Sequence, residues 1–431
     1  MDKRRLHRAV EWGKDVLIAV LAVSAVWLAI RAQSPGVLGL FAQSAAGSYS
    51  DRNTAGSRTE AVRPLRMTVN LGQGVHYAQL YNIAAGDELF QSFAGLLMET
   101  LSSAGQPTQA DRDTWERAVA QEPGVTFDFQ GEVPMSVLSQ WLSGSQSPQE
   151  AAVRRLTMSI SQDQVALTYR DESTGTYYRR WSTVVNHQHL REALEGYSGN
   201  GVAYAFESEA AQLVDPDTLL PAQDPTPKIY TADTPTAGGQ SALEALMEDL
   251  DIPAGLSSFY RAGDEWVGRS GNDSFRLSDA GVLVYTNEEG SDLFQTEGAG
   301  LPAAAECSRR LAAAALSPRM GAARLYLVSA AESAGGYDVS FAYHLDGVPV
   351  LSDSGPAAQF RVENGRVTSF TLRLRRYTDS GETAAVLPLR QAAAALAALD
   401  RQTAELLLTD ADRGGDRIVP GWSAVYGQKE G

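Results

Sequence analysis

The sequence is poor in cysteine and in long apolar runs, and each shortage narrows what the chain can be. Its single cysteine, Cys307, excludes an internal disulfide, and 431 residues can bury enough apolar surface to fold without one. Cys307 lies in the alanine-rich segment 303–316, where a buried small residue is the expected role. The one long apolar run is Val16–Ile30, so a membrane span is expected there and nowhere downstream.

Basic residues are also scarce. The chain has 36 lysines and arginines against 52 aspartates and glutamates, a net charge of −16. Residues 1–31 hold six basic and three acidic side chains, which leaves 30 and 49 for the rest, a net charge of −19. Such an acidic surface repels nucleic acid and anionic lipid headgroups, so we expect no nucleic-acid partner.

Only five histidines are present, which limits metal and catalytic chemistry. His187 and His189 form a His-x-His, but no third ligand follows at a matching spacing, and a zinc site needs three or four ligands. Motifs of the G-x-S-x-G, S-x-x-K and H-E-x-x-H types are missing from the sequence. We therefore predict no catalytic residue, no metal and no cofactor; a surface hydrolase with an unrecognised site stays an alternative.

The ends of the apolar run predict its orientation. Five basic residues precede Val16–Ile30, and Arg31 closes it. By the positive-inside rule the N-terminus stays in the cytoplasm and the C-terminal ectodomain lies outside the cell. We expect a retained single-pass anchor in the cell membrane. The alternative is a cleaved signal peptide, with a small-residue site at Ala42-Gln43-Ser44-Ala45.

One face of the predicted span carries small residues. On a helix, Ile18, Ala22, Ala25 and Ala29 lie on the same side, and small residues at this spacing allow helices to approach closely in lipid. We interpret this face as the candidate partner-binding surface. The competing interpretation is that an alanine-rich chain produces such stripes by chance.

Downstream, helical periodicity alternates with runs of short strands, which predicts an α+β protein: an N-terminal transmembrane helix followed by two or three domains of helices packed on antiparallel meander sheets. Five prolines in 215–236 break helices and sheet ladders, so this segment is the expected domain boundary. Asn364-Gly365 predicts a tight hairpin turn, and Ser241 with Glu244 predicts a capping box opening a helix.

These signals predict seven segments. They are a basic cytoplasmic leader (1–14), a transmembrane anchor (15–31), a flexible stalk (32–63), an N-terminal α+β ectodomain (64–214), a Pro-rich linker (215–236), a middle α+β domain (237–300) and a C-terminal α+β domain (301–431).

Short motifs in the last third of the chain carry a family resemblance. A long helix over 303–316 leads to Leu325-Tyr326-Leu327, then to the turn Leu345-Asp346-Gly347-Val348-Pro349-Val350. A hairpin follows around Asn364-Gly365, and the chain ends near Val419-Pro420-Gly421-Trp422. This series resembles the YycH/YycI family, and the long first region favours the YycH-like arrangement over the shorter YycI-like one.

The resemblance implies a function. Members of the family are membrane-anchored accessory regulators of the WalK sensor histidine kinase, part of a two-component system in Gram-positive bacteria. A sensor histidine kinase, and a paralogous regulator in the same membrane, are therefore the expected partners, and the C-terminal domain is expected to be YycI-like. The helix-then-meander pattern also resembles PepSY-type domains, which inhibit or chaperone secreted hydrolases, and this stays the alternative.

Overall fold

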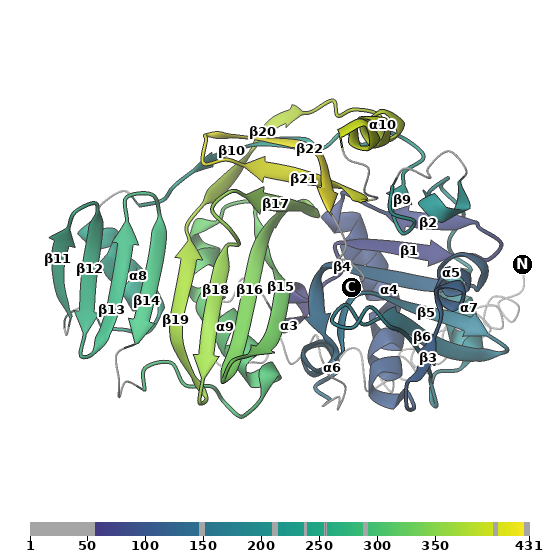
Figure 1. Cartoon of the computed structure of the whole chain (residues 1–431), viewed down its shortest axis with the longest axis horizontal. Helices are drawn as coiled ribbons and strands as arrows, with labels where there is room; N and C mark the ends of the chain where they lie inside the picture. Colours follow the sequence, from purple (N-terminus) through teal and green to yellow (C-terminus); the bar gives the residue numbers. More distant parts are fainter. Residues whose placement is uncertain are drawn as a thin grey trace, which may run out of the picture. The chain divides into compact units, whose positions relative to one another are not determined.

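The computed structural model describes residues 57–145, 151–208, 214–236, 239–253, 255, 257–287, 292–399 and 404–425. The predicted leader and membrane anchor lie outside these residues. Among the helices that the structure does describe, none is both long and apolar enough to cross a bilayer. Residues from Thr54 onward form one compact unit. Its helices and antiparallel sheets confirm the α+β class (Figure 1).

The first sheet has the strand order β3-β7-β6-β5-β4-β1-β2, with every neighbouring pair antiparallel. Its strands are β1 (Arg66–Asn70), β2 (His76–Gln79), β3 (Thr108–Ala110), β4 (Gly124–Pro134), β5 (Ala152–Ser161), β6 (Gln164–Arg170) and β7 (Tyr177–Trp181). The helices of this region are α3 (Arg58–Ala61), α4 (Ile83–Ser103), α5 (Arg112–Glu116), α6 (Met135–Ser143) and α7 (His187–Leu194). A two-stranded ladder, β8 (Ala203–Tyr204) with β9 (Leu219–Leu220), follows.

Helix α4 shows why the sequence folds this way locally. Asn82 caps its N-terminus, since the side-chain oxygen accepts from the backbone N–H of Ala85 at 3.0 Å. Leu89, Phe93 and Leu97 recur at helical spacing and are buried at or below 3% exposure. The apolar stripe therefore fixes which face of α4 packs onto the first sheet.

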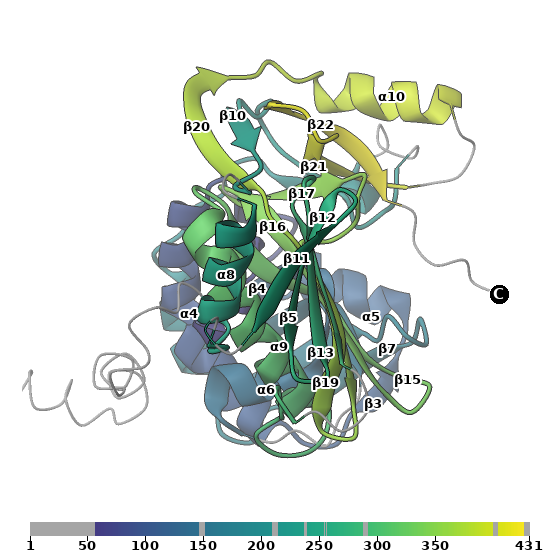
Figure 2. The same cartoon turned by 90° about the vertical axis from the view of Figure 1, so that its left-hand side faces the viewer.

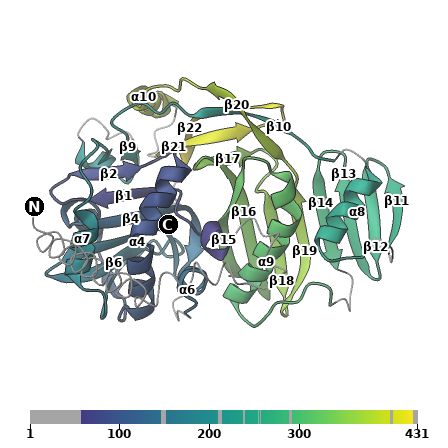
Figure 3. The same cartoon turned by 180° about the vertical axis from the view of Figure 1, so that it is seen from behind.

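The second sheet continues as β15-β16-β18-β19-β14-β13-β12-β11, again antiparallel throughout. Its strands are β11 (Ser258–Ala262), β12 (Glu265–Ser270), β13 (Asp273–Ser278), β14 (Val282–Asn287), β15 (Arg324–Ser333), β16 (Gly336–Leu345), β18 (Ala358–Glu363) and β19 (Arg366–Arg373). Helix α8 (Gln240–Asp249) precedes the first four strands and α9 (Leu301–Leu316) precedes the others. Figure 3 shows α4, α9 and α8 covering the same face of the two sheets.

An aromatic cluster closes the middle of the second sheet. Phe275 of β13 and Tyr285 of β14 lie with ring centroids 4.9 Å apart, and Tyr285 stacks on Phe370 of β19 at 4.8 Å. Phe294 packs edge-on against Tyr285 at 5.1 Å. The predicted middle and C-terminal domains thus share one core here, while the division into domains itself stays a prediction.

A third sheet, which we call the C-terminal sheet, has the order β20-β10-β22-β21-β17. Its strands are β10 (Lys228–Asp233), β17 (Val348–Ser352), β20 (Arg376–Thr383), β21 (Glu405–Asp412) and β22 (Arg417–Val425), and helix α10 (Leu389–Leu399) precedes β21. β17 and β21 run parallel, and the other pairs are antiparallel. Figure 2 shows this sheet and α10 lying across one end of the helix-covered sheets.

The structure confirms one local prediction from the sequence and corrects others. Asn364 and Gly365 have φ values of 50° and 73°, which confirms the tight hairpin turn. The capping box is wrong, because α8 begins at Gln240 and so places Ser241 inside the first turn; Gly239 occupies the N-cap without a side-chain bond. The last residues of the predicted stalk form α3, because Ala61 is apolar and buried against the core. The predicted Pro-rich linker contains β10, which pairs with two strands.

A buried network of charges joins the C-terminal sheet to the first sheet. Glu405, the first residue of β21, accepts from Arg66 of β1 at 2.9 Å and pairs with Arg154 of β5 at 2.9 Å. Arg155 also pairs with Glu405 and lies 3.0 Å from Asp128 of β4, which pairs in turn with Arg66. Arg66, Asp128 and Glu405 are each exposed by no more than 4%. Each charge is therefore neutralised by partners on other strands.

The two carboxylates of this network stay ionised. Burial by itself would raise the pKa of Glu405, but Arg154, Arg155 and Arg66 outweigh it and lower that pKa. In the same way burial by itself would raise the pKa of Asp128, but Arg66 and Arg155 outweigh it and hold that pKa well below its ordinary value. Since both pKa values are lowered, the stabilisation is present above about pH 4 and is lost as the pH falls below it.

We expect Glu405→Gln to destabilise the protein by about 3 kcal/mol at pH 7, because it leaves Asp128 as the one remaining carboxylate among three arginines of this network. Urea unfolding followed by circular dichroism measures this. The matched control is Glu382→Gln, which removes an exposed partner of Arg417 and should change stability by less than about 0.5 kcal/mol. If both variants lowered the free energy of unfolding by the same amount, the buried network would stabilise the protein no more than an exposed ion pair does.

The first and second sheets are in close contact at Gly131. A Cβ atom there would lie 2.3 Å from the carbonyl oxygen of Leu327 and 2.8 Å from the Cα of Val328. The neighbouring residue Glu132 makes the parallel bridge to Ser329 that links β4 with β15. We expect Gly131→Ala to lower the free energy of unfolding by about 1–3 kcal/mol, since backbone must move. Thermal unfolding followed by circular dichroism measures this. The control is Gly196→Ala, where a Cβ atom would have no neighbour within 4 Å, and this variant should unfold at nearly the wild-type temperature.

Candidate functional site

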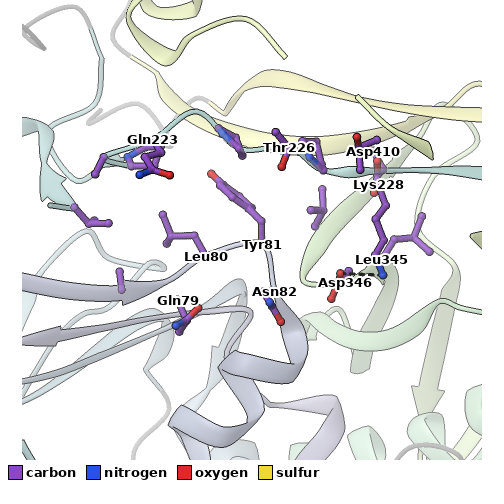
Figure 4. Close-up of a pocket in the computed structure, with 18 of the residues that line it drawn as sticks. Gln79, Leu80, Tyr81, Asn82, Gln223, Thr226, Lys228, Leu345, Asp346 and Asp410 are labelled. Atoms are coloured by element: carbon purple, nitrogen blue, oxygen red, sulfur yellow. Dashed lines mark ion pairs between the residues drawn. The ribbon is translucent and has the colours of Figure 1, made fainter. Parts of the chain in front are cut away.

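A pocket of about 700 Å³ opens where the three sheets meet. We call it the junction pocket. Its walls come from the end of β2 and the loop to α4 (78–82), the proline-rich stretch before β10 (221–228), the turn between β16 and β17, and β21. Figure 4 shows side chains from all of these segments facing a shared space. Its volume lies within the range typical of small-molecule sites.

The walls are tied together by bonds to the backbone. The side chain of Asn200 accepts from the N–H of Ala78 at 3.2 Å and donates to its carbonyl at 2.9 Å, which pins the segment Asn200–Val202 beside β2. Asp346 accepts from the N–H of Ile83 at 3.1 Å, which holds the β16–β17 turn against the start of α4. Residues far apart in the sequence are thereby fixed around one space.

Opposite charges gather at one end of the junction pocket. The Nζ of Lys228 lies 3.6 Å from Oδ2 of Asp346 and 3.3 Å from Oδ2 of Asp379 (Figure 4 draws the first pair). Asp346, followed by Asp379, raises the pKa of Lys228. One ammonium therefore serves two carboxylates. Arg324 lines the space beside them but pairs with carboxylates of α3 and α4, so this end of the pocket carries more negative than positive charge even before a third carboxylate is counted.

The third carboxylate is Asp410 of β21. Its residue is 1% exposed, and its Oδ1 has no hydrogen-bond partner. The reason lies in the register, because Asp410 stands opposite Val350 of β17 and Pro420 of β22, and neither side chain can donate. Burial raises the pKa of Asp410 to about 8. Figure 4 places Asp410 at the same end of the pocket as Lys228 and Asp346.

Tyr230 completes this end, and Tyr81 lines the middle of the pocket (Figure 4). Burial, then the charges of Asp346, Asp379 and Asp410, raise the pKa of Tyr230, so three carboxylates lie near enough to act on its hydroxyl group. Tyr81 has a φ of 51°, a left-handed backbone that a bulky residue adopts only at a cost of about 1–3 kcal/mol. Such strain is commonly kept where a side chain must point into a site.

The residues singled out from the sequence fall elsewhere. Ile18, Ala22, Ala25 and Ala29 lie outside the described residues. His187 and His189 sit on α7, and no group of three metal-ligating side chains occurs in the part of the chain that the structure describes. Cys307 is 4% exposed, which confirms its expected burial, and burial raises the pKa of its thiol to about 11.

Sequence reasoning did not find the junction pocket. The turn at Asp346-Gly347 was predicted, and its φ values of 51° and 85° confirm it, but nothing marked it as part of a site. No sequence pattern marked Asp410 as part of a site either. An available signal was an aspartate continuing a run of apolar strand residues, since aspartate is disfavoured inside strands.

Comparison with solved structures identifies the fold. The chain resembles YycH from Bacillus subtilis with a TM-score of 0.56 over 87% of this chain and 97% of that one, at 14% sequence identity. The expected YycH-type fold is thereby confirmed. No protein-family model matches the chain, and no curated protein matches it.

We expect Asp410→Asn to change how stability depends on pH. Because the pKa of Asp410 is about 8 in the folded protein and about 4 when unfolded, the folded state keeps a proton that the unfolded state loses. The free energy of unfolding therefore falls as the pH rises from 4 to 8. Asparagine does not titrate, so the free energy of unfolding of the variant should not show this fall. At pH 8 it should exceed that of wild type by about a few kcal/mol, with little difference at pH 4.

Urea unfolding at several pH values measures this difference. The control is Asp233→Asn, the same change at an exposed position of β10 that pairs with Arg376. Its free energy of unfolding should depend on pH as that of wild type does. A wild-type minus Asp410→Asn difference that stays constant with pH would contradict the raised pKa.

Proposed function

We propose that this protein is an extracytoplasmic, membrane-anchored regulator that binds an envelope-sensing histidine kinase of a two-component system and modulates it. The observation that carries the proposal is the fold correspondence with YycH over 97% of that chain. The predicted anchor and the motifs around Asp346-Gly347 and Asn364-Gly365 support it independently, because they come from the sequence.

The proposed action is binding without catalysis. One contact is made inside the bilayer by the small-residue face Ile18, Ala22, Ala25 and Ala29, and a second is made outside by the ectodomain. A partner held by both contacts shifts between its two signalling states only if this chain binds one state more tightly than the other. The modulation therefore requires two linked contacts.

Crosslinked co-purification from native membranes tests the proposal. Recovery of a sensor kinase with the intact chain, and loss of most of it when residues 15–31 are replaced by an unrelated span, is the expected result. The sharper comparison is Ala22→Leu with Ala25→Leu, which fills the small-residue face, against Val20→Leu with Val23→Leu on the opposite face. The first pair should reduce kinase recovery several-fold and the second should not.

Other outcomes separate the alternatives. Capture of a secreted hydrolase by the native and the replaced span alike would favour a PepSY-like binding module. That alternative has structural support in the two helix-then-meander units, α8 with β11–β14 and α9 with β15, β16, β18 and β19. Turnover of a cell-surface substrate that one polar substitution abolishes would favour an enzyme.

A further inference from the structure

We infer that the junction pocket binds an organic ligand through a primary ammonium group on an aliphatic chain, with the carboxylate of Asp410 as its counterion. The inference concerns this unit alone and does not depend on the proposed contact with a kinase. Its basis is a buried carboxylate that lines a pocket of ligand size and lacks a partner for Oδ1.

The balance of charge selects a cation. Asp346, Asp379 and Asp410 all act on the ring of Tyr230, while Lys228 is the cation that lines this end of the pocket among the described residues. Lys228 is already shared by Asp346 and Asp379. An incoming ammonium would supply the missing positive charge and three N–H donors, which match an acceptor that has none.

The chemistry of the residues that line the pocket favours an organic cation over a metal ion. In the described part of the chain no three carboxylate, histidine or cysteine side chains are grouped so as to hold a metal. The lining instead includes the aliphatic residues Leu80, Val202 and Val348 and the rings of Tyr81 and Tyr230. Aliphatic walls suit the hydrocarbon part of an amine, and tyrosine faces attract ammonium groups.

Binding should release a proton from Asp410. An ammonium pairs with the carboxylate and not with the protonated acid, so the proton on Asp410 leaves to solvent as the ion pair forms. Charged or titratable groups near Asp410 are Lys228 and Tyr230 of β10, Asp346 of the β16–β17 turn and Asp379 of β20. The pKa values of Lys228 and Tyr230 are raised and that of Asp379 is lowered, each away from the range between pH 6 and 8. Burial keeps His344 of β16 neutral in this range by lowering its pKa to about 3.

Ligand-observed NMR titration of the full chain in detergent, with pentylamine as the probe and pentanol as its neutral counterpart, tests the inference. We expect pentylamine to bind at millimolar concentration or better, and pentanol at least about tenfold more weakly. Affinity for pentylamine should rise by about tenfold per pH unit from pH 6 to 7 and level off above 8. Asp410→Asn should lose this binding and its pH dependence, while Asp233→Asn should keep both.

Lys228→Met distinguishes the inference from damage to the fold. Removing the internal ammonium should raise the affinity for pentylamine several-fold, and a damaged fold would lower that affinity. Three results would overturn the inference: no binding of pentylamine by wild type at millimolar concentration, equal binding of pentanol, or unchanged binding by Asp410→Asn. Displacement of pentylamine by sodium or magnesium ions at equal concentration would also overturn it, in favour of a metal site.

Discussion

The buried ion pairs of Glu405 with Arg66, Arg154 and Arg155 hold the last part of the chain against the first sheet. The interaction spans more than 330 residues of sequence, since Arg66 lies on β1 and Glu405 begins β21. Once its first residue is fixed in this way, β21 runs parallel to β17 and antiparallel to β22, and so completes the C-terminal sheet. Because unpaired buried charges are costly, the network also disfavours other positions for this strand.

The junction pocket is a consequence of that arrangement. Glu405 and Asp410 lie on the same strand, one in a network where every charge is paired and the other facing Val350 and Pro420. Both carboxyl groups are buried, but the pKa of Glu405 is lowered because arginines pair with it, whereas the pKa of Asp410 is raised because burial is not offset by an ion pair. Strand β21 holds this acid at the wall of the junction pocket, and Tyr81, whose backbone is left-handed, lines the same pocket.

The sequence predicted what depends on local pattern. The alanine-rich run indicated the helix over 303–316, the Asn364-Gly365 pair indicated its hairpin, and short motifs indicated the YycH-type fold, all of which the structure bears out. It did not predict the pairing of β10 with β20 and β22, because prolines in 215–236 obscured a short strand whose partners lie about 150 and 190 residues away. The junction pocket could not be predicted for the same reason, because its residues come together only through such long-range pairings.

The most direct test of this account is the titration of the Asp410 carboxyl group itself. Aspartate labelled with ¹³C at the side-chain carboxyl, with the Asp410 resonance assigned by its disappearance in Asp410→Asn, reports that pKa without reference to stability or ligand. The account predicts a midpoint near pH 8 in the unliganded protein. A midpoint near 4, the ordinary value for aspartate, would show that the carboxylate is already neutralised or solvated and would contradict the account.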